Sequence, residues 1–173
     1  GQAHLPFASN YKTIPAVVIS QTPSNFESGV VIDKGTADGL AAGYPVVTQA
    51  GLVGAVVTAS AHQATVRVVT DPGFLVGVTV AKGPNGIGEA KGAGRSNPLM
   101  VTGVLPSVAV KVGQILTTSG LQLEAFPPGI PVGVVKSVST PTGQLVQTVT
   151  LSPLISLTDL NVVSVLVFSG QTP

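Results

Sequence analysis

Three residues occur in an order that one class of serine hydrolase uses: His62, Asp71 and Ser119. In such a triad the histidine takes the serine proton and the aspartate orients the histidine. The four residues before Ser119, Ile115-Leu116-Thr117-Thr118, include no glycine-rich segment that could form an oxyanion hole. A turn that ends a strand at Ser119-Gly120 is the favoured interpretation, and a two-barrel serine hydrolase remains an alternative.

The sequence motifs that would indicate a metal site or a phosphate site are equally weak. The two histidines, His4 and His62, lie far apart and the chain has no cysteine, so no zinc-ligand spacing exists. The segment from Asp33 to Asp38 lacks the alternating oxygen ligands of a calcium loop. The sequence Gly86-Ile87-Gly88 has no third glycine at the phosphate-loop spacing, and no Lys-Ser or Lys-Thr follows it. The sequence predicts no metal and no cofactor.

Charge is scarce in this chain. Charged residues make up 9% of the sequence and the formal net charge is +1, so long-range attraction to nucleic acid or anionic lipid is weak. No apolar run reaches the roughly 18 to 20 residues that span a bilayer. The chain begins at Gly1 without an initiating methionine, and we expect a cut fragment or a processed form, with any membrane-anchoring helix absent from it.

The elements that must position any site are short strands. The 21 glycines, the 14 prolines and the Val-rich runs between them are typical of strands joined by turns. We expect strands over residues 16–20, 29–33, 44–48, 52–59, 65–70, 76–82, 99–104, 114–118, 132–139, 145–152 and 162–168. This pattern predicts an all-β fold of two small, about six-stranded β-barrels packed together, with little or no helix.

The two halves of the chain contain a similar sequence pattern. Residues 42–57 and residues 112–135 share a glycine turn, an apolar strand that ends in threonine, and then glycine, two or three apolar residues, glycine and a valine strand. The second glycine of each copy, Gly54 or Gly133, interrupts a strand, which usually marks a bulge or a sharp bend. The repeat suggests a duplicated barrel unit.

The expected domain boundaries follow from these groups. They are a disordered N-terminal remnant over 1–13, a first barrel over 14–82, a Gly-rich connecting loop over 83–98 that holds one strand near 86–90, a second barrel over 99–169, and a tail over 170–173. The last strand either closes the second barrel or crosses to the first. Structural turns are expected at Asp33, Gly35, Asp38, Gly39, Gly43, Gly51, Gly54, Gly113, Gly120, Gly129 and Gly133.

One loop is a candidate partner site. Residues 126–133 place a ring and three prolines in a stiff apolar segment, and such a loop is either a packed plug or a binding surface. If it binds a partner, its contact residues are Phe126, Pro128, Ile130 and Pro131.

Several segments together resemble a signature of the MreC family of bacterial rod-shape proteins. They are Pro23-Ser24-Asn25-Phe26, Val31-Ile32-Asp33-Lys34-Gly35, Asp38-Gly39, Gly43, Pro45-Val46-Val47-Thr48, Gly51-Leu52-Val53-Gly54, Thr70-Asp71-Pro72, Val112-Gly113, Thr117-Thr118-Ser119-Gly120-Leu121 and Phe126-Pro127-Pro128-Gly129-Ile130-Pro131-Val132-Gly133. The resemblance covers about residues 16–168 in one order. It departs at Pro128, where a lysine is common, and over residues 83–98.

The resemblance implies a non-enzymatic scaffold on the extracytoplasmic face of the bacterial inner membrane. It implies an N-terminal transmembrane helix and a coiled coil, both outside this chain. The implied partners are the elongation-specific penicillin-binding transpeptidase, MreD and RodA, together with self-association. The competing functions are the serine hydrolase and a β-barrel adaptor of an export machine.

Overall fold

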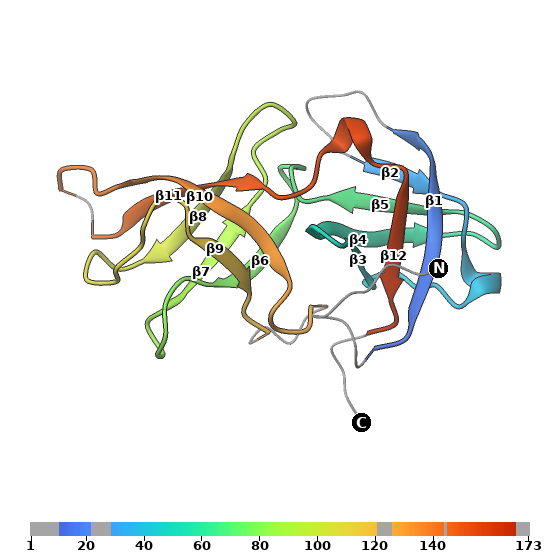
Figure 1. Ribbon diagram of the computed structural model, residues 1–173, viewed down its shortest axis with the longest axis horizontal. Coiled ribbons are helices and arrows are strands. Elements are labelled where there is room, and N and C mark those ends of the chain that lie inside the picture. Colours follow the sequence, from blue (N-terminus) through green and yellow to red (C-terminus); the bar gives the residue numbers. More distant parts are fainter. Residues whose placement is uncertain (1–10, 22–28, 121–125, 144, 169–173) are drawn as a thin grey trace.

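The computed structural model describes residues 11–21, 29–120, 126–143 and 145–168, which form two closed β-barrels (Figure 1). The first barrel contains β1 (Thr13–Gln21), β2 (Gly29–Ile32), β3 (Pro45–Thr48), β4 (Gly51–Ala59), β5 (Ala64–Val68) and β12 (Val162–Leu166). The second contains β6 (Leu75–Thr79), β7 (Ile87–Lys91), β8 (Leu99–Val104), β9 (Ile115–Thr118), β10 (Pro131–Ser139) and β11 (Gln147–Pro153). The predicted all-β fold of two six-stranded barrels is confirmed.

In the part of the chain that the structure describes, helical structure is limited to two single turns of 3-10 helix, η2 (Thr36–Asp38) and η3 (Leu157–Asp159). Within the described residues no helix is long and apolar enough to cross a membrane.

The two barrels have the same strand order. In the first, the neighbours around the barrel run β3-β4-β5-β2-β1-β12, and in the second they run β9-β10-β11-β8-β7-β6. Every pairing of neighbours is antiparallel. The two barrels differ in where their sixth strand lies along the chain. β6 comes before the other five strands of the second barrel, whereas β12 comes after the other five strands of the first. This shared order supports the duplication that the sequence repeat suggests.

The expected boundary at residue 82 is wrong, because β6 belongs to the second barrel. A turn at Asp71-Pro72-Gly73 redirects the chain after β5: the Asp71 carboxylate accepts the Gly73 N–H at 2.6 Å, and the Phe74 N–H donates to the Asp71 carbonyl at 2.8 Å. β6 then pairs with β7 and β9. The last strand, whose barrel the sequence left open, pairs with β1 and β3 of the first barrel.

The strand expected near residues 86–90 is present as β7, but the connecting loop over 83–98 is corrected, since β7 pairs with β6 and β8 as part of the second barrel. Its glycines are set by close packing. A Cβ on Gly88 would lie 2.8 Å from Cγ1 of Val101, and one on Gly92 would overlap the Asp71 carbonyl. The expected terminal segments fall largely outside the described residues, and β1 begins at Thr13.

Strands β5, β7 and β11 show the two-residue alternation of a barrel wall. In β5, for example, Ala64, Val66 and Val68 are buried while Thr65 and Arg67 face outward. Successive side chains of a strand point to opposite faces, so every second residue fills the barrel. The Val-rich runs of the sequence therefore form the core.

The repeated glycines mark equivalent bulges. Between β3 and β4 the register shifts so that Val53 is extra, and between β9 and β10 it shifts so that Val132 is extra. The glycine that follows each bulge lies against a neighbouring backbone, because a Cβ on Gly54 would overlap the Arg67 carbonyl and one on Gly133 would crowd the Ser152 carbonyl. The predicted bulges are confirmed, and they bend each strand around its barrel.

The barrels meet along β4 and β10. A Cβ on Gly51 would overlap the Pro131 carbonyl, so these two strands approach backbone to backbone. The chain crosses between the barrels twice, over residues 69–74 and over residues 154–161. The second crossing is the orange-red segment that rises toward the top of the view in Figure 1 before it enters β12. We call residues 154–161 the crossing segment.

Candidate protein-binding surface

The loop predicted to bind a partner is held by Thr118, the last residue of β9. The buried Thr118 hydroxyl donates to the Pro127 carbonyl at 2.6 Å and accepts the Ile130 N–H at 2.9 Å. The Thr118 carbonyl accepts the Gly129 N–H at 2.9 Å. Because these bonds add to the fixed φ of the prolines, the loop has little freedom left to lose on binding.

The four predicted contact residues differ in exposure. Ile130 is 0% exposed and belongs to the core, so it cannot touch a partner, and that part of the prediction is wrong. Its N–H donates to the Thr118 hydroxyl and its carbonyl accepts the Thr118 N–H, so the residue is held against the end of β9 with its side chain in the core. Phe126 and Pro131 are half-buried and Pro128 is exposed. The Phe126 ring packs edge-on against the buried Phe74 ring with centroids 5.7 Å apart.

Within this loop, Ile130 therefore fills the core, whereas Pro128 and part of the Phe126 ring are accessible to a partner. Leu75, which follows Phe74 directly, is 46% exposed on β6. We call Leu75, Phe126, Pro128 and Pro131 the loop surface.

The sequence interpretation missed other exposed apolar residues of the second barrel, Val112 and Ile115, which are 67% and 55% exposed. Ile115 stands opposite the half-buried Val134 of β10. A signal for such residues was present, because two successive apolar residues on one strand point to opposite faces and one of them can lie outward, as in Leu75-Val76 and Ile115-Leu116.

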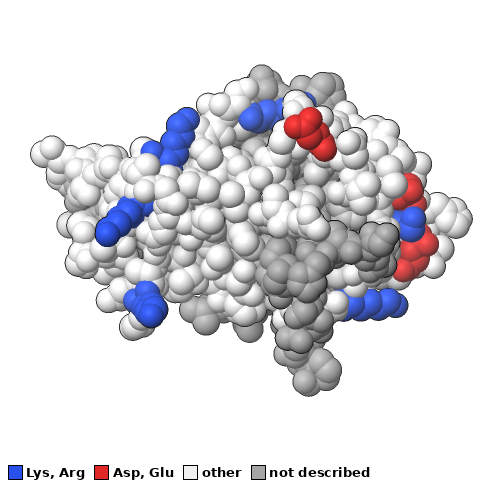
Figure 2. Space-filling view, in the orientation of Figure 1, with Lys and Arg blue, Asp and Glu red and all other residues white. Residues whose placement is uncertain are grey.

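Charge is distributed unevenly between the barrels. Among the described residues, β6 to β11 and their loops carry five basic side chains and one acidic side chain: Lys82, Lys91, Arg95, Lys111 and Lys136 against Glu89. In Figure 2 the part of the surface over the second barrel, at the left, shows blue patches and no red. The overall charge of +1 conceals this asymmetry. An acidic surface would be attracted to the second barrel.

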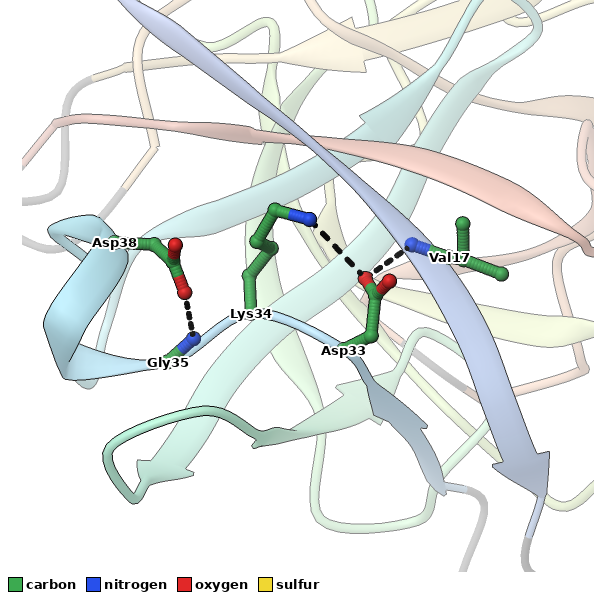
Figure 3. Close-up of polar contacts among 5 residues, drawn as sticks. All are labelled: Val17, Asp33, Lys34, Gly35 and Asp38. Atoms are coloured by element: carbon green, nitrogen blue, oxygen red, sulfur yellow. Dashed lines mark hydrogen bonds and ion pairs between the residues drawn. The ribbon is translucent and has the colours of Figure 1, made fainter.

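Two predicted turn residues of the first barrel play different parts (Figure 3). The Asp38 carboxylate accepts the Gly35 N–H at 3.0 Å and caps η2, as a turn residue should. The Asp33 carboxylate instead reaches across to β1 and accepts the Val17 N–H at 2.7 Å, with the Lys34 ammonium 3.7 Å away. The Val17 hydrogen bond, aided by Lys34, lowers the pKa of Asp33.

The remaining predicted turn positions fall into two groups. Positive φ occurs at Gly39, Gly43, Gly51, Gly113, Gly120 and Gly129. Close backbone contact, without positive φ, explains Gly35, Gly54 and Gly133.

The triad residues are not brought together. His62 lies exposed in the turn before β5 and Asp71 follows that strand. A five-residue strand separates its ends by about 16 Å, which is far beyond the hydrogen-bond distance that a base and its orienting carboxylate require. Ser119 belongs to the other barrel, where its N–H donates to the Gly77 carbonyl at 2.9 Å. Within the described ranges, no three His, Asp or Glu side chains gather as a metal site would need.

Comparison with known proteins shows that this chain is similar to the members of one protein family. The family model "Rod shape-determining protein MreC, barrel core" matches residues 18–167. The cell shape-determining protein MreC of Listeria monocytogenes is 36% identical over 94% of this chain and 56% of its own length. That of Haemophilus influenzae is 31% identical over 90% of this chain and 44% of its own length. The chain thus spans about half the length of these curated relatives.

Solved structures agree with the fold. MreC from Pseudomonas aeruginosa is similar with a TM-score of 0.81 and 32% identity, over 89% of this chain and 98% of that one. MreC in a complex between penicillin-binding protein PBP2 and MreC from Helicobacter pylori is similar with a TM-score of 0.64 and 18% identity, over 90% and 99% of the two chains. The second likeness concerns the fold alone.

Proposed function

This chain belongs to the MreC family of cell shape-determining proteins, and from that premise we propose that it is a scaffold that binds and organises peptidoglycan synthases of the elongation machinery. The observation that carries the proposal is the family match over residues 18–167, which includes both barrels. The Helicobacter pylori complex of MreC with PBP2 supports a penicillin-binding protein as the first partner to test.

The family consists of cell shape-determining structural proteins and not of enzymes. The serine-hydrolase alternative is therefore wrong, in agreement with the separation of His62 from Asp71 by β5. Membership in this family also excludes the other competing function, that of a β-barrel adaptor of an export machine.

We place the two barrels on the extracytoplasmic side of the inner membrane, joined to it by segments outside this chain. A membrane-anchored scaffold holds its partners near the site of wall synthesis, so a weak barrel contact gains from a high effective concentration. MreD, RodA and a second copy of the chain are further proposed partners in this arrangement.

The loop surface is the proposed contact for the synthase. It is rigid, because Thr118 holds the loop through two hydrogen bonds, and it is apolar at Leu75, Phe126 and Pro128. The basic second barrel around it would steer an acidic partner surface toward this contact. Binding would act by population shift: a scaffold that prefers the active conformation of the synthase raises the fraction of synthase in that conformation. Self-association would compete for or organise the same surface.

The decisive experiment is a calorimetric titration of this chain with the extracytoplasmic part of the penicillin-binding transpeptidase from the same organism. Leu75→Glu and Pro128→Glu place charge on exposed positions of the loop surface. Val17→Glu is the matched control, because Val17 is exposed on the first barrel at 45%, much as Leu75 is at 46%. We expect the first two variants to bind at least about tenfold more weakly, since a charge must lose its water at the contact, and the control to bind normally.

Equal affinity of all three variants would refute the loop surface as the contact. If no variant and no wild-type chain binds, the chain should be fused to a dimerising coiled coil and the titration repeated. Binding that appears only in the fused dimer would assign the missing affinity to avidity. No binding in either form would refute the partner.

A further inference from the structure

Three connections of the second barrel lie at one end of the molecule. Because every pairing of neighbours is antiparallel, β6, β8 and β10 run in the same direction and their last residues lie at the same end of the barrel. The connections that follow these strands are residues 80–86, 105–114 and 140–146. In Figure 1 they lie at the left, on the side of the second barrel away from the first.

This end of the barrel carries positive charge without acidic residues. We call residues 80–86, 105–114 and 136–146 the basic end. Its sequence contains three lysines, Lys82, Lys111 and Lys136, and no aspartate or glutamate. The lysines are exposed, and no carboxylate among the described residues lies within ion-pair distance of them. Figure 2 shows blue patches and no red over this part of the surface. These charges are therefore available to an anion.

A tight turn at the basic end places Val112 at its tip. The Gln114 N–H donates to the Lys111 carbonyl at 3.1 Å, and the Gln114 side-chain carbonyl accepts the Lys111 N–H at 3.2 Å. Gly113 has a φ of 93°, which glycine adopts without strain. The turn leaves Lys111 exposed and Val112 67% exposed, side by side in the chain.

The other two lysines are placed next to this turn. The Gln114 side-chain amide donates to the Val80 carbonyl at 2.5 Å, two residues before Lys82. The Val135 N–H donates to the Gln114 carbonyl at 2.8 Å, and Lys136 follows Val135 on β10. Because Gln114 is bonded to both neighbours, the three lysines extend from backbone positions that are fixed relative to one another.

Exposed apolar side chains gather at the same end. Leu105 is 42% exposed, Val112 67%, Ile115 55% and Leu145 86%. The Gln147 side-chain amide donates to the Leu105 carbonyl at 2.8 Å and so ties the β8–β9 connection to β11. Single exposed apolar residues are ordinary on a protein surface. Four of them at one end, together with three lysines, mark an interaction surface.

We propose that the basic end docks on the surface of a bilayer that contains anionic phospholipid. The lysine ammonium groups bind lipid phosphates, and the tips at Val112 and Leu145 enter the boundary between headgroups and acyl chains. A dissolved polyanion would pair with the lysines but offers no apolar phase for these tips, so the apolar residues favour a lipid surface. The net charge of +1 makes attraction of the whole chain weak, whereas within the Debye length of about 8 Å the local charge decides.

The basic end is separate from the loop surface. β6 begins at Leu75 of the loop surface and leads to Lys82, and β10 begins at Pro131 of the loop surface and carries Lys136 toward its other end. A five-residue strand such as β6 separates its ends by about 16 Å. A chain that contacts lipid through the basic end therefore keeps the loop surface free for a protein, and the inference does not depend on the proposed synthase contact.

The test is sedimentation of the chain with two kinds of vesicle, phosphatidylcholine alone and phosphatidylcholine mixed with phosphatidylglycerol. We expect the chain to sediment with the mixed vesicles at millimolar lipid and to stay in solution with the neutral ones. Lys111→Gln and Lys136→Gln should each weaken binding about fivefold, which is the contribution of one basic residue near an anionic surface. Lys12→Gln is the control and should bind normally, because Lys12 is an exposed lysine next to β1 of the first barrel.

Val112→Ser tests entry of the apolar tip into the bilayer. It should weaken binding at least about fourfold, the contribution of one buried CH₂ group. Val162→Ser is the matched control, because Val162 is 60% exposed on the first barrel. Salt raised from about 0.1 M to about 1 M shortens the Debye length from about 10 Å to about 3 Å and should release the wild type from the mixed vesicles. Circular dichroism checks that each variant is folded.

The proposal is overturned if the chain sediments equally with both kinds of vesicle or with neither, or if the two control variants lose as much binding as Lys111→Gln and Val112→Ser. A calorimetric titration of Val112→Ser with the penicillin-binding transpeptidase separates lipid from a protein partner. Normal affinity for the transpeptidase with weaker vesicle binding supports the lipid surface. Lost affinity for the transpeptidase with unchanged vesicle binding would assign the basic end to a protein instead.

Discussion

Val17 and Asp33 are joined by a reciprocal pair of hydrogen bonds. The Val17 N–H donates to the Asp33 carboxylate at 2.7 Å, and the Asp33 N–H donates to the Val17 carbonyl at 3.0 Å. The carboxylate thus continues the β1–β2 ladder past Ile32, the last residue of β2. A side chain replaces the backbone carbonyl that the ladder would otherwise need.

This pair predicts a pH dependence. Because the pKa of Asp33 is lower in the folded chain than its ordinary value of about 3.9, the ionised carboxylate contributes stability that is present above the ordinary pKa and is lost as pH falls through the folded one. Urea unfolding of the wild type and Asp33→Asn between pH 2 and pH 7 should show a constant difference at neutral pH that shrinks in acid.

Lys34→Gln is the matched comparison for this titration. The Val17 N–H is the larger cause of the lowered Asp33 pKa and Lys34 a smaller one, so Lys34→Gln should keep most of the acid-dependent loss of stability. A pH profile of Lys34→Gln that coincides with that of Asp33→Asn would contradict the assignment to Val17.

Thr118→Val should destabilise the chain by about 2 to 4 kcal/mol. The substitution keeps the side-chain shape but leaves the buried Pro127 carbonyl and Ile130 N–H without their partner. Thr117→Val, one residue earlier and half-buried on the other face of β9, should change stability by no more than about 0.5 kcal/mol. Equal urea midpoints for the two variants would show that the hydroxyl does not hold the loop.

Gly54→Ala should cost about 3 kcal/mol or more, because its Cβ would overlap the Arg67 carbonyl and the β4–β5 ladder would have to open. Gly43→Ala tests the other cause of glycine use, since φ is 95° there and no atom lies within 4 Å of the added Cβ. Its cost should be about 1 to 2 kcal/mol, from the left-handed backbone alone. Thermal unfolding of both variants would rank them, and the reverse ranking would refute the close-approach argument.

Val165→Asp should open the first barrel and spare the second. Val165 is 0% exposed on β12, the strand that closes the first barrel between β1 and β3, and a charge cannot be buried there without a partner. Hydrogen exchange should lose protection on β1 to β5 while β7 to β11 stay protected. Val162→Asp is the control, because Val162 is 60% exposed on the same strand; loss of protection in both variants would mean that charge on either face disrupts β12.

The local sequence pattern was sufficient to predict strands and bulges. Short apolar runs between turn residues predicted strands such as 99–104, which matches β8, and the repeated pair of glycines predicted the two bulges that follow Gly51 and Ile130. These features depend on side chains and φ angles within a few residues of one another. The family could be inferred for a similar reason, since turns of this kind recur in a set order along the chain.

Pairing between distant strands was decided only in the tertiary structure. Periodicity shows that β6 and β12 are strands but does not show which edges they join. β6 leaves the strands before it to pair with β7 and β9, and β12 leaves the strand before it to pair with β1 and β3. Exposure was decided in the same way: Ile130 and Pro128 belong to one stiff loop, yet Ile130 is bonded to Thr118 and buried in the core while Pro128 is exposed. Residues of the two crossings, such as Thr70 and Ile155, are far apart in sequence and line one groove only because two closed barrels pack together. Local propensity acts over a few residues, whereas barrel closure and burial depend on contacts across the whole chain.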